Sequence, residues 1–213
     1  MIKTIILDLD GPILDGRLRH YRCYADIMIE HGYNPIPINR YWDMKRNRIN
    51  RHIYLAESDA ESFYNNFLLN WLQRIEQKEY LALDLFQNGS FKTLTSWKSQ
   101  GISLVLATMR HNSENLKWQL NQLNIITLFD EVIAIGNGDS GKVKAEHIIS
   151  KVKNIKSLNA VWIGDTEVDV DAARYLGVDV CAVTCGLRTA EFLESLNPNY
   201  LETNLSSFAA KLQ

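Results

Sequence analysis

The stretch Thr4–Gly16, TIILDLDGPILDG, carries the strongest fold signal in this sequence of 213 residues. It begins with a continuous apolar run, Thr4–Leu7, which ends at two acidic residues, Asp8 and Asp10. An uninterrupted run of this kind is typical of a strand that is buried on both faces of a parallel sheet. The stretch therefore predicts a buried first strand with carboxylates at its carboxyl end.

Similar apolar runs recur along the chain and alternate with helix-like stretches. The runs lie at Ile102–Ala107, Val132–Ile135, Ala160–Ile163 and Val178–Val183. The helix-like stretches lie at Phe91–Ser99, Glu114–Leu123, Lys144–Val152 and Val170–Leu176. Strands that alternate with amphipathic helices form right-handed βαβ crossovers. We therefore expect an α/β fold with an open, doubly wound (Rossmann-like) parallel sheet.

One segment, from about residue 16 to residue 87, breaks this alternation. It has no strand-like run, and its helical periodicity is clearest at four residues that fall on one helix face. These residues are Phe63, Phe67, Trp71 and Ile75. The pattern predicts an all-helical cap over residues 16–87, inserted into a core made of residues 1–15 and 88–213.

Composition and charge exclude several classes of function. The formal net charge of −2 gives no overall field that would attract nucleic acid or an anionic membrane. The N-terminal apolar run meets Asp8 well before the ~18 residues that a membrane-spanning helix needs. The three cysteines are an odd number without zinc-site spacing, which favours a reducing, cytoplasmic setting.

Polar side chains gather where the predicted strands end. Asp8 and Asp10 follow the first strand, Thr108 follows the second, and Asp165 and Asp169 follow the fourth. In an open parallel sheet, ligands bind beyond the carboxyl ends of the strands. Carboxylates that meet there repel one another unless a cation joins them, and Mg²⁺ prefers oxygen ligands. Such an ion would also screen a phosphate dianion from Asp8, so that this carboxylate could attack phosphorus.

Four segments, in this order, resemble the four motifs of the haloacid dehalogenase superfamily. They are DLDGPILDG (Asp8–Gly16), LVLATMR (Leu104–Arg110), the lysine Lys142 of GKVKAEHI, and IGDTEVDVDAA (Ile163–Ala173). The tail from Cys181 onward is similar to the end of the phosphoglycolate phosphatase-like branch. The resemblance implies an inserted helical cap and a Mg²⁺-dependent phosphatase that acts on a small phosphorylated metabolite.

The resemblance also implies roles for individual residues. Asp8 matches the nucleophile that forms an aspartyl-phosphate, and Asp10 matches the general acid that later becomes the general base. Thr108 and Lys142 match the pair that holds the transferring phosphoryl group. The implied metal site consists of Asp8, the main-chain carbonyl of Asp10, Asp165 and Asp169, the last of which binds the metal or orients metal-bound water.

The family pattern favours Lys142 over Lys144 as the motif lysine. Glu146 and Ile148 stand at the offsets that the pattern expects from Lys142. We therefore expect Lys144 to lie on the helix surface.

Substrate contacts are expected from two regions. Met109 and Arg110 follow the motif threonine, although the family often has asparagine where Met109 stands, and Pro12 replaces a usual threonine. In the cap, Lys45, Arg46 and Arg48 belong to a cation-rich stretch that is either a solvated helix face or a partner for an anionic group of the substrate.

Three other functions stay open at this point. A β-phosphoglucomutase-like phosphotransferase would use the same two aspartates, Asp8 and Asp10. A phosphonatase would need a cap lysine that forms a Schiff base, for which Lys45 is a candidate. A binding or regulatory module could keep the fold without the chemistry, since fold does not guarantee function. Asp10 argues against a dehalogenase, because that branch lacks the second aspartate of DxD.

Overall fold

The computed structural model describes residues 2–136, 140–152, 155 and 159–212 of the chain, which form two compact units. The core unit consists of Met1–Asp15 and Leu85–Gln213, and the cap unit of Gly16–Asp84. Among the residues just given, no helix combines the length and the apolar character needed to cross a membrane.

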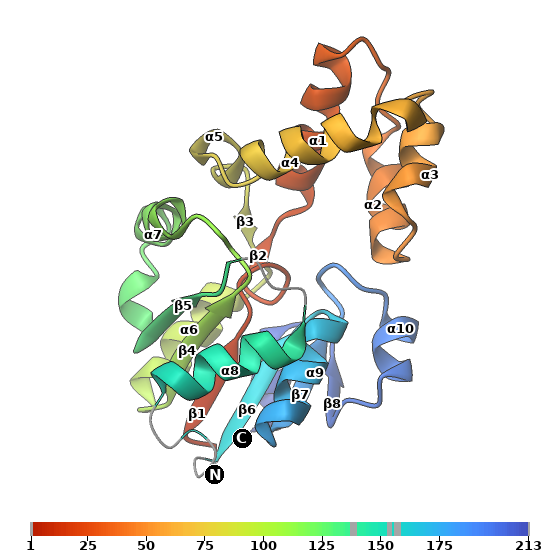
Figure 1. The fold of residues 1–213 in the computed structure, drawn as a ribbon. Coiled ribbons are helices and arrows are strands. Elements are labelled where there is room, and N and C mark those ends of the chain that lie inside the picture. Colours follow the sequence, from red (N-terminus) through yellow and green to blue (C-terminus); the bar gives the residue numbers. More distant parts are fainter. Residues whose placement is uncertain (1, 137–139, 153–154, 156–158, 213) are drawn as a thin grey trace. The chain divides into compact units, whose positions relative to one another are not determined.

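A six-stranded parallel sheet forms the centre of the core unit (Figure 1). Its strands are β1 (Thr4–Leu7), β4 (Ser103–Thr108), β5 (Glu131–Ala134), β6 (Ala160–Gly164), β7 (Asp179–Val183) and β8 (Tyr200–Glu202). They lie in the order β5-β4-β1-β6-β7-β8, and every neighbouring pair is parallel. The expected doubly wound α/β fold is confirmed, with β8 as a strand that the apolar runs did not reveal.

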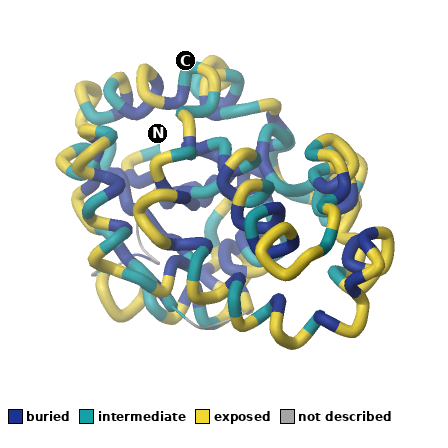
Figure 2. The backbone as a smooth tube through the Cα atoms, turned by 90° about the horizontal axis from the view of Figure 1, so that it is seen from above, coloured by how far each residue is buried: buried dark blue, intermediate teal, exposed yellow. Residues whose placement is uncertain are grey.

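Helices cover both faces of this sheet. One face carries α6 (Ser90–Ser99), α7 (Ser113–Gln122) and α11 (Leu205–Lys211), and the other carries α8 (Gly141–Lys151) and α9 (Glu167–Leu176). Alternate residues of β1 pack against the helices on opposite faces of the sheet. Ile5 and Leu7 pack on the first face, and Ile6 packs on the second. The helices alternate between buried and exposed stretches in Figure 2, because only one side of each packs inward. The remaining short elements are the 3₁₀ helix η2 (Ile126–Leu128) and α10 (Ala190–Ser195).

The register of the sheet brings the motif residues to one edge. Leu7 pairs with Leu106 of β4 and with Ile163 of β6. The next residue, Asp8, donates its N–H to the carbonyl of Ile163 at 3.0 Å. The residues that follow β1, β4 and β6 therefore meet at the same edge of the sheet.

A second, two-stranded sheet lies at the boundary of the units. It pairs β2 (Leu14–Asp15) with β3 (Leu85–Phe86) in antiparallel fashion. Because of this pairing, residues 85–87 belong with the core unit, whereas the sequence pattern had suggested that they belong to the cap. Strands of two residues are too short to produce a periodic signal.

The cap unit is helical. Its elements are α1 (Arg17–Glu30), α2 (Ile38–Arg46), α3 (Arg51–Ala56), the 3₁₀ helix η1 (Glu61–Phe63), α4 (Tyr64–Arg74) and α5 (Lys78–Leu81). The four periodic residues that indicated a helix are all buried, and they pack with Tyr24 and Tyr41. A buried ion pair between Arg19 and Asp84, 2.8 Å long, joins α1 to the end of the unit.

Candidate active site

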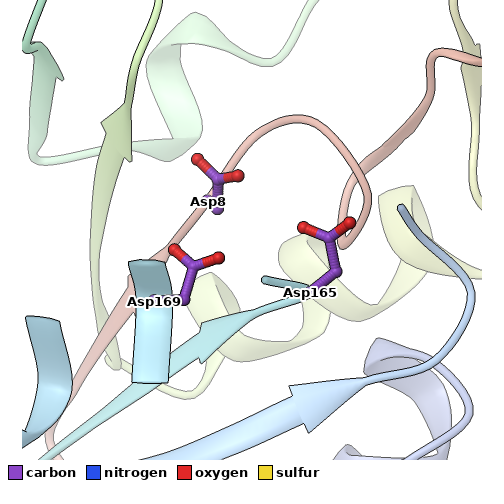
Figure 3. A group of neighbouring side chains, drawn as sticks. All are labelled: Asp8, Asp165 and Asp169. Carbon is purple, nitrogen blue, oxygen red and sulfur yellow. The ribbon is translucent and has the colours of Figure 1, made fainter. Parts of the chain in front are cut away.

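Three carboxylates converge at the carboxyl edge of the sheet. Asp8 follows β1, Asp165 follows β6, and Asp169 stands in the first turn of α9 (Figure 3). Each offers an oxygen that lies within 4.8 Å of the others. The structure therefore brings together three of the four residues that the sequence suggested for a metal site.

Asp169 is held firmly from several directions. Its Oδ2 accepts hydrogen bonds from the backbone N–H of Thr166 at 3.2 Å and from the Thr166 hydroxyl at 2.8 Å, which caps the start of α9. Its Oδ1 accepts from Trp162 Nε1 at 3.2 Å and from Lys144 Nζ at 2.7 Å. Both oxygens of Asp169 are thus engaged by the protein itself.

The lysine at this site is Lys144, so the expected placement of the two motif lysines is wrong. Lys144 Nζ lies 2.9 Å from Asp8 Oδ1 and 2.7 Å from Asp169 Oδ1, and its side chain is only 1% exposed. The side chain of Lys142 is 63% exposed, and its ammonium lies 3.8 Å from Glu146. Lys142 is therefore the residue on the helix surface.

The packing of α8 explains this difference. The buried face of α8 contains Gly141, Lys144, Ala145 and Ile148, which follow the i, i+3, i+4, i+7 spacing. A Cβ atom on Gly141 would lie 2.5 Å from the backbone nitrogen of Ala172, so α8 and α9 are in close contact there. This contact brings the inward-facing lysine to the start of α9. The spacing of the apolar residues in α8 could have indicated from the sequence that Lys144, and not Lys142, faces inward.

Burial and like charges perturb the ionisation of the cluster. Burial raises the pKa of Asp8 to about 7, although the ammonium of Lys144 opposes the shift. The negative charges of Asp169 and Asp10 contribute to this rise. Burial also raises the pKa of Asp165, and the charge of Asp8 adds to the effect. Burial disfavours the ammonium of Lys144, but Asp169 and Asp8 together raise its pKa. One ammonium among three carboxylates leaves an excess of negative charge.

Two carboxylate oxygens remain for a cation. Within the described part of the chain, Asp165 Oδ1 is buried and accepts no hydrogen bond, whereas its Oδ2 accepts one from the backbone N–H of Leu187. Asp8 Oδ1 accepts a hydrogen bond from Lys144 Nζ, and Asp8 Oδ2 is the other oxygen of this carboxylate. Leaving a buried carboxylate oxygen without a partner is costly. The donor set therefore suits a hard divalent cation.

The side chain of Asp10 points to a different partner. Arg110 donates from Nε to Asp10 Oδ2 at 2.7 Å and from Nη2 to Asp10 Oδ1 at 2.8 Å. The arginine side chain is 4% exposed and the aspartate side chain 30%. The sequence suggested Arg110 as a substrate contact and Asp10 as a metal residue, but it gave no sign of this two-point ion pair.

The other expected core residues lie close by. Thr108 ends β4 and is buried, and the register described above puts it at the same sheet edge as Asp8. Met109, which was expected to contact substrate, is half-buried and packs against the apolar layer beneath α8 and α9. Met109 therefore contributes to packing. Thr108, by contrast, lies at the sheet edge where its hydroxyl can contact a bound phosphoryl group.

In the cap unit, Lys45 is surrounded by aromatic rings. Its Nζ lies 3.0 Å from His20 Nδ1, 5.0 Å from the centre of the Trp71 ring and 5.6 Å from that of Tyr41. Arg46, the last residue of α2, is half-buried, and Arg48 is exposed with φ of 57°. Sequence reasoning assigned no role to His20, because isolated histidines carry no motif.

The chain is similar to known proteins over most of its length. The family model described as haloacid dehalogenase-like hydrolase matches residues 5–183. The phosphoglycolate phosphatase of Synechococcus elongatus is 25% identical over 201 residues, which are 94% of this chain and 92% of that protein.

Two solved structures have the same fold over the whole chain. A predicted phosphoglycolate phosphatase from Haemophilus somnus has a TM-score of 0.79 at 17% identity, and the likeness covers 100% of this chain and 98% of that one. A haloacid dehalogenase-like hydrolase from Streptococcus pneumoniae has a TM-score of 0.78 at 18% identity, with 100% and 99% covered. Since the family model spans most of the 213 residues, the chain belongs to the haloacid dehalogenase-like hydrolase family.

Proposed function

We propose that this protein is a Mg²⁺-dependent phosphatase that hydrolyses the phosphate monoester of a small, anionic metabolite through an aspartyl-phosphate on Asp8. One observation carries the proposal: the buried Lys144 is held between Asp8 and Asp169, beside an oxygen of Asp165 that has no partner within the described residues. An attacking carboxylate, a fixed ammonium and a vacant oxygen ligand are the groups that phosphoryl transfer needs.

The reaction proceeds in two displacements. An oxygen of the Asp8 carboxylate attacks phosphorus, and the bond from phosphorus to the leaving oxygen breaks while Asp10 donates a proton to that oxygen. Asp10, now a carboxylate, takes a proton from water, and the resulting hydroxide oxygen attacks the phosphorus of the aspartyl-phosphate. The bond between phosphorus and Asp8 then breaks, which releases inorganic phosphate and restores the carboxylate.

Charge stabilisation comes from residues around the phosphoryl group. The ammonium of Lys144 and the hydroxyl of Thr108 are donors to its oxygens, and Asp169 keeps the ammonium in place. Asp165 Oδ1, Asp8 Oδ2 and the main-chain carbonyl of Asp10 would hold the metal. When it is bound, Mg²⁺ neutralises charge on the phosphate and on the nucleophile.

Arg110 links the acid-base residue to substrate choice. Both oxygens of Asp10 accept hydrogen bonds from Arg110, so this pair has to open before Asp10 donates a proton. A carboxylate or second phosphate on the substrate is a natural new partner for the guanidinium. In the cap unit, Lys45 is a second candidate cation, with its Nζ over the rings of Trp71 and Tyr41. The name of the Synechococcus elongatus relative, a phosphoglycolate phosphatase, supports a small anionic substrate.

The test compares Asp8→Asn with a matched control, Asp171→Asn. Asp171 is an exposed residue of α9, so its replacement removes the same charge away from the site. With an aryl phosphate and Mg²⁺, we expect phosphate release by the wild type and the control, and none by Asp8→Asn. Chelation should abolish release, and Mg²⁺ should restore it.

Each proposed feature has its own contrary outcome. Turnover like that of the wild type in Asp8→Asn would refute the covalent mechanism. Activity that survives thorough chelation would refute the metal requirement. With a panel of small phosphorylated metabolites, isomerised product and little free phosphate would indicate a phosphotransferase of the mutase type instead.

A further inference from the structure

The two oxygens of Asp165 differ in their surroundings. Oδ2 accepts a hydrogen bond from the backbone N–H of Leu187 at 2.5 Å, and Oδ1 is left without a partner among the residues that the structure describes. The donor belongs to the segment Thr184–Arg188, which follows β7 and which we call the β7 loop. This loop therefore decides which oxygen of the carboxylate is available to a ligand.

The approach of the β7 loop to Asp165 is too close for a side chain. A Cβ atom on Gly186 would lie 2.0 Å from Asp165 Oδ2 and 2.5 Å from its Cγ. On another side, a Cβ atom on Gly11 would lie 2.2 Å from the same Cγ. Atoms that are not bonded do not approach to such distances, so two glycines enclose the carboxyl group. The backbone at Gly186 and at Gly11 therefore lies directly against the carboxyl group of Asp165 on two sides.

Contacts on both sides of Gly186 hold the loop in place. Before it, Cys185 Sγ donates to the carbonyl of Gly11 at 3.4 Å, and Gln87 Nε2 donates to the carbonyl of Cys185 at 3.1 Å. After it, Arg188 donates to Glu167 through Nε at 2.7 Å and through Nη2 at 3.0 Å. Glu167 begins α9, two residues after Asp165. The loop is thus tied to the nucleophile segment at one end and to α9 at the other.

We propose that the β7 loop is a positioning element for the metal site: Leu187 N–H and Gly186 direct Asp165 Oδ1 toward the cation, and the Arg188–Glu167 pair fixes the loop that does so. The inference rests on the proposed metal-dependent function. In this proposal these residues act through Asp165, so they affect the reaction through metal affinity. Groups that orient a metal ligand in this way typically change metal affinity ~10–100-fold when they are replaced.

Calorimetric titration of metal-free protein with Mg²⁺ tests the proposal directly. We expect Gly186→Ala to raise the dissociation constant for Mg²⁺ at least tenfold, because the added methyl group displaces Asp165. Arg188→Gln, which breaks the anchor and leaves the backbone donor, should raise it several-fold. At saturating Mg²⁺, kcat of Arg188→Gln for an aryl phosphate should stay within a few-fold of the wild type.

The matched control is Arg40→Gln. Arg40 forms a comparable two-point pair with Glu57 within the cap unit, with its Nη2 2.7 Å from the carboxylate, so its loss should leave Mg²⁺ affinity unchanged. Thermal unfolding in the presence of chelator separates misfolding from loss of affinity. If Gly186→Ala does not fold, Arg188→Gln alone decides.

Asp165→Asn separates failure of this inference from failure of the proposed function. If Asp165→Asn loses Mg²⁺ binding while folded Gly186→Ala and Arg188→Gln bind like the wild type, the β7 loop has no positioning role and the proposed function stands. If Asp165→Asn binds Mg²⁺ as the wild type does, the proposed metal site is itself wrong.

Discussion

Replacing Lys144 by methionine should damage both stability and catalysis, and replacing Lys142 in the same way should not. Lys144→Met keeps a side chain of similar length but removes the ammonium that lies 2.9 Å from Asp8 and 2.7 Å from Asp169. Removing one partner of a buried ion pair typically costs ~3–5 kcal/mol, because the remaining charges stay buried without compensation. We expect a loss of this size in the free energy of unfolding.

The catalytic effect follows from the same contacts. The loss of one fixed donor to a transferring group typically lowers kcat ~10²–10³-fold. Lys144 also opposes the rise in the pKa of Asp8, which already stands at about 7, so its removal raises that pKa further. At neutral pH, more of the nucleophile would then be protonated and inactive. We therefore expect kcat of Lys144→Met to fall by at least ~10²-fold.

Lys142→Met is the matched control on the same helix. Its side chain is 63% exposed and its ammonium lies 3.8 Å from Glu146, and exposed i, i+4 pairs of this kind contribute ~0.3–0.5 kcal/mol. Phosphate release from an aryl phosphate and urea denaturation at pH 7 provide the two measurements. Nearly normal kcat in Lys144→Met together with strong loss in Lys142→Met would refute the assignment and move the role to Lys142.

Three further predictions concern pH, Arg110 and the cap. Because the pKa of Asp8 is raised, the metal-free folded protein binds more protons than the unfolded chain from about pH 4 to pH 7. The melting temperature in chelator should therefore fall as the pH rises through this window, and less so in Asp8→Asn; a rise would contradict the pKa shift. Arg110→Lys keeps the charge but cannot make a two-point contact with a carboxylate or second phosphate of the substrate, which is the partner proposed for the guanidinium once it leaves Asp10. We therefore expect kcat/KM for an anionic alkyl phosphate to fall ~10-fold or more, with turnover of a neutral aryl phosphate within a few-fold. Equal effects on both substrates would exclude a role of Arg110 in substrate choice. Lys45→Ala should lower kcat/KM for the best anionic metabolite ~10–100-fold and leave kcat/KM for a neutral aryl phosphate nearly unchanged. The control Arg40→Gln should change kcat/KM for neither substrate. If Lys45→Ala has the same effect on both substrates, Lys45 contributes only to the packing of the cap.

The sequence predicted the fold class because the strands of the sheet are buried on both faces. Such strands appear in the sequence as uninterrupted apolar runs. Each of the strands β1, β4, β5, β6 and β7 coincides with such a run. The parallel arrangement then places the ends of β1 and β6 side by side, which brings Asp8 and Asp165 together. By contrast, β2, β3 and β8 were not predicted. They have two or three residues each, and their pairing depends on partners that are distant in the sequence.

The sequence by itself thus determined the class of fold, the edge where the chemistry gathers and the acidic residues that meet there. These follow from local patterns and from the geometry that all parallel sheets share. Only the tertiary structure decided how close Lys144 comes to Asp8, that Arg110 pairs with Asp10, and that Leu187 N–H of the β7 loop donates to Asp165 Oδ2. Each of these depends on how closely two elements pack, as α8 packs on α9 at Gly141 and the β7 loop packs on Asp165 at Gly186. Packing distances of this kind depend on both partners at once, so no motif in one segment contains them.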